Sequence, residues 1–108
     1  MIDEFQIKGL EKLLNSSVIK DIYPMIDRIK ALYVEPKYYR DIIIFNIYLN
    51  DPSIDNENMY RAGFDPHYMV DVHIKKYLPY MGIELNNIAL DFIVRDPNGK
   101  IIYSYNNE

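Results

Sequence analysis

With 108 residues, 49% of them hydrophobic, and a net charge of −4, the chain has the size of one domain that buries a single core. It contains no cysteine, which excludes a disulfide scaffold, a thiolate zinc site and a cysteine nucleophile, and which is typical of a reducing, cytoplasmic compartment. The acidic start lacks the features of a signal peptide, and no run approaches the roughly 18 apolar residues of a membrane span, so we expect a soluble protein.

The first predicted element is a short amphipathic helix over residues 2–14. The polar side chains of residues 15–17 compete with helical backbone hydrogen bonds, so we expect the helix to end at Asn15. The apolar stripe of this helix comprises Ile2, Phe5, Leu10, Leu13 and Leu14.

The next segment, residues 22–34, is compatible with either a helix or a strand. Its apolar residues fit helical spacing, but Pro24 interrupts a helix and a strong strand follows. We favour a hairpin in which residues 26–34 pair with residues 40–49 across a turn that contains Pro36.

The second strand of this hairpin is apolar on both faces, which predicts a central strand that is covered on both sides. One face carries Ile43, Phe45, Ile47 and Leu49, and the other carries Ile42, Ile44 and Tyr48.

A polar surface loop over residues 50–63 should lead into a second helix. Asp65 is a good N-cap, Pro66 suits the first helical position, and Pro79 with Gly82 should end or kink the helix. Its predicted buried stripe comprises Val70, Ile74, Tyr77 and Met81.

The last quarter predicts a β-hairpin. Apolar residues alternate over residues 88–94 and again over residues 101–105, and the turn residues Asp, Pro, Asn and Gly occupy positions 96–99. The whole pattern predicts a two-layer α+β domain over residues 1–108, with the order α-β-β-α-β-β. Its sheet should be four-stranded and mostly antiparallel, with the helices packed on one face.

The net negative charge of the chain arises in residues 51–73, which contain five acidic residues and one basic residue, Arg61. Asp51, Ser53, Asp55 and Glu57 match the first four oxygen ligands of a calcium loop. The match then fails, because Asn56 and Ala62 stand where such a loop needs Gly and Glu. We therefore expect a solvated acidic loop and no metal site.

Both histidines lie in the same segment. His67 and Asp71 are four residues apart and share a helix face, but His73 points to a different side. A zinc site would need a further ligand, so we interpret His73 as a core or boundary residue and His67 as an exposed first-turn residue. A small enzyme that uses His67 and Asp71 is a third hypothesis.

The sequence contains no recognisable catalytic or cofactor motif. No serine lies in a nucleophile-elbow setting, and the four glycines are scattered, so no phosphate-binding glycine loop is formed and we expect no cofactor. Eleven tyrosines could stack on bases, but the chain is acidic and has no basic groove to hold a nucleic-acid backbone. The sequence therefore does not indicate an enzyme or a nucleic-acid binder.

Protein–protein contact is the remaining hypothesis. Eleven tyrosines exceed what so small a core can hold, and tyrosine is favoured at interfaces. We expect Met59, Tyr60 and Phe64 to anchor a partner, while the carboxylates of residues 51, 55 and 57 select a basic surface. The alternative is that these apolar residues fold the loop back onto its own domain. The residues assigned to partner binding are Asp51, Asp55, Glu57, Met59, Tyr60 and Phe64.

Two biological settings suit such a module. The first is a structural subunit, for example a phage virion or accessory component, which the A+T-rich codon usage implied by many Ile, Tyr, Asn and Lys residues would fit. The second is an acidic inhibitor or immunity-type protein that blocks a basic nucleic-acid-binding site on an enzyme.

Overall fold

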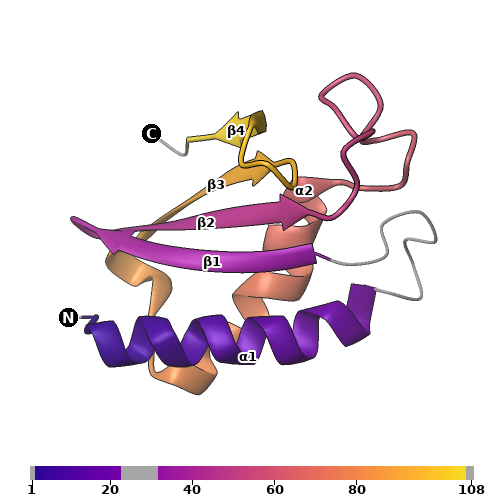
Figure 1. Cartoon of the computed structure of the whole chain (residues 1–108). Helices are drawn as coiled ribbons and strands as arrows, with labels where there is room; N and C mark the ends of the chain where they lie inside the picture. The colour runs from indigo at the N-terminus through magenta and orange to yellow at the C-terminus, as the bar shows by residue number, and fades with distance from the viewer. Residues whose placement is uncertain (1, 23–31, 107–108) are drawn as a thin grey trace.

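The computed structural model describes residues 2–22 and 32–106. A four-stranded sheet forms one layer, and α1 and the helical segment that begins with α2 form the other (Figure 1). This confirms the predicted α+β class and element order. The elements are α1 Glu4–Ile22, β1 Leu32–Tyr39, β2 Ile42–Leu49, α2 Pro66–Tyr68, η1 Met69–Ile74, η2 Lys75–Met81, η3 Leu85–Asn87, β3 Ala89–Arg95 and β4 Ile101–Tyr105.

The sheet has the order β1-β2-β3-β4. Its outer pairs, β1–β2 and β3–β4, are antiparallel, whereas the central pair, β2–β3, is parallel. The parallel pair follows from the connection: the helical segment between β2 and β3 returns the chain to the end of the sheet at which β2 begins, so that β3 runs in the same direction as β2. The sheet is therefore mixed but mostly antiparallel, as predicted.

The first hairpin turns at Arg40 and Asp41, whose φ angles of 47° and 63° are those of a tight two-residue turn. The prediction that Pro36 lies in the turn is wrong, because Pro36 lies inside β1, opposite Phe45. Proline is tolerated on an edge strand, where no ladder hydrogen bond needs its missing N–H. The first part of the predicted strand, residues 26–31, lies outside the described residues.

The prediction that the first helix ends at Asn15 is also wrong, because α1 continues through this residue. The Asn15 side chain donates to the carbonyl oxygens of Glu11 and Val34, at 2.7 Å each, and accepts from the Val34 amide at 2.8 Å. The side chain therefore bonds both the neighbouring strand and a carbonyl of its own helix, and the helix continues.

The core lies between the two layers. Leu10 and Leu14 of α1 are fully buried against it, but Phe5, which we predicted on the same stripe, is 87% exposed. The buried hydrophobic side chains that the sheet contributes to this core are Leu32, Val34, Ile43, Phe45, Ile47, Leu49, Leu90, Phe92 and Val94.

The predicted central position of β2 is confirmed, because β2 lies between β1 and β3. The opposite face of the sheet carries no helix in the described residues, so the prediction that this strand is covered on both sides is wrong (Figure 1). Ile42, Ile44 and Tyr48 on this face are only partly buried. For Tyr48, a neighbouring side chain on the sheet contributes to that burial, since its ring lies 6.4 Å from the Tyr33 ring.

Tyr33 offers a pH-dependent test of the contact between β1 and α1. Its hydroxyl donates to the Glu11 carboxylate, and this hydrogen bond, with desolvation and the negative charge, raises the pKa of Tyr33 from 10.0 to about 12. Since the folded pKa is raised, the bond stabilises the fold below the ordinary tyrosine pKa, and this stabilisation is lost as the pH rises through about 12.

We expect Tyr33→Phe to remove a late-titrating group from the tyrosinate absorbance curve of the folded protein. Glu11→Gln should keep the Tyr33 hydroxyl but lower the pH at which it ionises, because the negative charge that opposes its ionisation is gone. If Tyr33→Phe instead removes tyrosinate absorbance that develops near the ordinary tyrosine pKa, then the raised pKa does not belong to Tyr33.

Candidate functional site

The loop between β2 and α2 is held by its own acidic side chains. Asp51 Oδ1 accepts from the amide of Ser53 at 2.9 Å and from its hydroxyl at 2.6 Å. Asp55 Oδ1 accepts from the amides of Glu57 and Asn58, at 2.9 Å each. The Ser53 hydroxyl and amide lower the pKa of Asp51. These carboxylates therefore shape two turns and remain at the surface.

The resemblance to a calcium loop does not extend to the geometry. Within residues 2–22 and 32–106, no group of three or more His, Cys, Asp or Glu side chains is placed to hold a metal ion. The oxygen atoms of Asp51 and Asp55 instead bond backbone amides one turn further along the chain.

Two of the three expected anchors of the loop are in the core. Met59 and Phe64 are 0% exposed, whereas Tyr60 between them is 51% exposed. Hydrogen bonds from Phe64 N to Met59 O and from Gly63 N to Tyr60 O close the loop, and Gly63 adopts a φ of 87°. The second of our two alternatives thus describes Met59 and Phe64: they fold the loop onto its own domain, while Tyr60 remains available at the surface.

The second helix begins as its sequence predicts. The Asp65 carboxylate accepts from the amides of His67 and Tyr68, and Pro66 occupies the first turn. The helix is not regular, because a π-helical turn, η1, follows α2, and a 3₁₀ helix, η2, follows η1. Gly82, with a φ of 71°, ends the segment.

His67 is not the exposed residue that we expected. It is half-buried, and its Nε2 atom lies 2.7 Å from the Tyr103 hydroxyl. Its ring also contacts Phe92 and Tyr105 edge-on, with centroid distances of 5.0 Å and 4.8 Å. The long-range contact with β4 explains the burial, since nothing near residue 67 in the sequence encodes it.

His73 occupies a different environment, as its position six residues further along the helix predicted. It is half-buried, in agreement with a boundary position, and its ring lies 5.5 Å from the Tyr68 ring. The two imidazoles therefore do not share a site.

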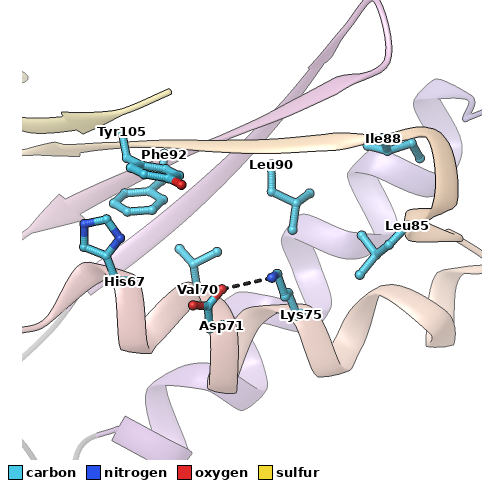
Figure 2. Close-up of a pocket in the computed structure, with 9 residues that line it drawn as sticks. All are labelled: His67, Val70, Asp71, Lys75, Leu85, Ile88, Leu90, Phe92 and Tyr105. Carbon is cyan, nitrogen blue, oxygen red and sulfur yellow. Dashed lines mark ion pairs between the residues drawn. The ribbon is translucent and has the colours of Figure 1, made fainter. Parts of the chain in front are cut away.

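A groove of about 220 Å³ separates the helical segment from β3 and β4 (Figure 2). Val70 and Leu90 contribute apolar walls, and Lys75 pairs with Asp71 at 2.9 Å on the helix side. On this groove, the His67 ring is bonded to the Tyr103 hydroxyl and the Asp71 carboxylate is paired with Lys75. The groove offers space for an apolar side chain near an ion pair.

The structure brings β4 against the acidic segment of residues 51–73, because the Tyr103 hydroxyl lies 2.7 Å from His67 Nε2. Partial burial, followed by the charges of Tyr103 and Asp65, raises the pKa of Tyr60. On β4, Ile101 is 53% exposed. The sequence predicts a strand here, but it carries no signal that this strand lies next to the acidic segment.

No helix in the described part of the chain is long and apolar enough to cross a membrane. No protein-family model matches the chain, and no curated protein matches it. Among solved structures, it is similar to the pilotin EpsS of the Vibrio vulnificus type 2 secretion system, with a TM-score of 0.35 and 13% identity over 95% of this chain and 91% of that chain. An overlay of this quality does not establish a common fold or function.

Proposed function

We propose that this protein is a non-enzymatic binding module that contacts a partner protein through its acidic loop. The contact surface, called here the loop surface, consists of Asp51, Asp55, Glu57 and Tyr60. The observation that supports it best is the exposure of Tyr60, at 51%, in a loop whose neighbouring apolar residues are buried. Tyrosine buries a large area at low entropic cost and keeps a polar tip, which suits an interface anchor.

The charge of the loop surface favours a basic partner. Residues 51–73 carry five acidic residues against Arg61, and the side chains of Asp55 and Glu57 are exposed. Such a surface attracts a positively charged protein over several ångströms and raises its association rate. The carboxylates would then surround Tyr60 as a polar rim.

The hydrogen bonds of the loop support binding in a second way. Asp51 and Asp55 each accept two hydrogen bonds within the loop, and Met59 and Phe64 fasten it to the core. A loop already held in one conformation loses little entropy when it binds. The loop surface is therefore preorganised.

The test is an affinity capture with the wild-type protein as bait, followed by measured affinities for the recovered partner. We expect Tyr60→Ala to weaken binding by roughly 30-fold, the effect of an interface anchor worth about 2 kcal/mol. The triple variant Asp51→Asn, Asp55→Asn, Glu57→Gln keeps the oxygen acceptors of the loop and should slow association, most strongly at low salt.

Tyr39→Ala is the matched control, because Tyr39 is exposed at the tip of the first hairpin, away from the loop. A partner that tolerates both the Tyr60 and the triple variant, or that is lost equally with Tyr39→Ala, would disprove a contact through the loop surface.

The loop surface would serve either of two settings, a structural subunit such as a phage virion component or an inhibitor of an enzyme with a basic nucleic-acid-binding site. They differ in stoichiometry. An inhibitor forms a closed complex with one enzyme, whereas a structural subunit assembles with many neighbours, and light scattering of the purified complex distinguishes the two.

A further inference from the structure

The two edges of the sheet differ in their capacity to accept another strand. At the β1 edge, the Asn15 side chain bonds both the amide and the carbonyl of Val34, as a neighbouring strand would. Two residues along, Pro36 has no N–H to donate. Charged Glu35 and Lys37 flank that proline. The β1 edge is therefore closed to strand addition.

The β4 edge has none of these protections. In the part of the chain that the structure describes, β3 is the only strand paired with β4. Residues 101–105 include no proline and no charged residue, and Ile101 and Ser104 are exposed. An uncharged edge strand of β-branched and aromatic residues is a template for pairing with another chain.

The register shows which backbone groups are available. The Ala89 amide donates to the Asp41 carbonyl on the β2 side. The backbone N–H and C=O groups of the odd-numbered residues of β3 therefore point toward β2, and those of the even-numbered residues point toward β4. Phe92 pairs with Tyr105 in this register. Ser104 therefore directs its N–H and C=O away from β3, toward a position that an added strand would occupy.

The surroundings of β4 define the charge of the added strand. The Asp65 carboxylate accepts a hydrogen bond from the His67 amide at 3.0 Å. His67, which follows Asp65 in the same acidic segment, bonds the Tyr103 hydroxyl. A second copy of this chain paired through β4 would bring two such segments together, which like-charge repulsion opposes. A basic segment finds complementary charge at the same place.

We propose that β4 accepts an extended, basic segment of the partner protein as a fifth strand. The backbone of that segment would bond the free edge at Ser104, and its Lys or Arg side chains on the helix side would lie near Asp65. This inference rests on the proposed function and specifies the chemistry of the partner.

The probe is a synthetic peptide of alternating lysine and valine, titrated into the isotope-labelled full chain and followed by amide chemical shifts and hydrogen exchange. We expect the largest shifts at residues 101–105 and slower exchange at the Ser104 amide. The same peptide with N-methyl groups on alternate residues keeps its charge but cannot complete the ladder, and should bind at least about tenfold more weakly. A glutamate–valine peptide should not bind.

Strand addition is disproved if the N-methylated peptide binds equally well, if the glutamate–valine peptide binds, or if the lysine–valine peptide does not bind. Protection of Ser104 that grows with protein concentration without peptide would instead identify a second copy as the occupant. Tyr60→Ala separates the two proposals: binding that is insensitive to Tyr60→Ala but lost on N-methylation supports strand addition and contradicts the role of Tyr60.

Discussion

Replacing Phe64 with alanine is expected to lower the free energy of unfolding by about 3–5 kcal/mol, the cost of removing a buried aromatic side chain and leaving a cavity. Phe64 is fully buried, although it lies in a polar loop. Its loss would also release the loop that presents Tyr60. Urea unfolding followed by circular dichroism measures the change, with a lower midpoint at an unchanged slope as the expected result.

The neighbouring exposed residue supplies the control. Tyr60→Ala should change the free energy of unfolding by about 0.5 kcal/mol or less, because half of the Tyr60 side chain is already in solvent. If Phe64→Ala were as mild as Tyr60→Ala, then Phe64 would not be in the core, and its role as a partner anchor would return.

The second large effect concerns the amide of Asn15. Asn15→Ala removes both hydrogen bonds to the Val34 backbone and one to the Glu11 carbonyl. We expect a loss of about 2–4 kcal/mol, because Val34 lies in the core and its polar groups would lose their partners. Alanine is the better helix former, but that gain is only about 0.5 kcal/mol.

Asn15→Asp and Ser16→Ala distinguish the strand contact from a local helix effect. Aspartate keeps the acceptor for the Val34 amide but cannot donate to the Val34 carbonyl, so it should be intermediate in stability. Ser16→Ala removes a hydrogen bond that stays within α1, to Leu13, and should be nearly neutral. If Asn15→Ala and Ser16→Ala had the same effect in thermal unfolding, the contact with β1 would contribute nothing.

Elements whose signals are local were predicted well. Asp65 caps its helix with its own side chain, and Asp96 organises the last turn by accepting from the amides of Asn98 and Lys100. The alternation over residues 88–94 corresponds to β3. Capping and turn formation involve residues a few positions apart, so the sequence contains the whole interaction.

Features that depend on a distant partner were predicted incorrectly or not at all. Asn15 has the chemistry of a helix terminator, but Val34 engages its amide and the helix continues. His67 has the position of an exposed first-turn residue, but Tyr103 of β4 buries it. In both cases the decisive hydrogen bond joins two elements that are remote in the sequence.

The candidate site divides in the same way. Composition alone located the acidic segment at residues 51–73 and showed an apolar group within it. It could not decide which of Met59, Tyr60 and Phe64 faces solvent, because an irregular loop has no period from which to infer a buried side. Nor could it place His67 of this segment against Tyr103 of β4, since that contact exists only after the sheet has formed.

The amino-acid sequence therefore determined the class of the fold, the order of its elements, the caps and turns, and the segment that carries the charge. These follow from periodicity, composition and interactions between near neighbours. The tertiary structure alone decided that Met59 and Phe64 are core residues, that Asn15 closes the β1 edge and that β4 is left open beside the acidic segment. Each of these outcomes depends on packing between distant elements, and packing selects among side-chain environments that local chemistry leaves equally possible.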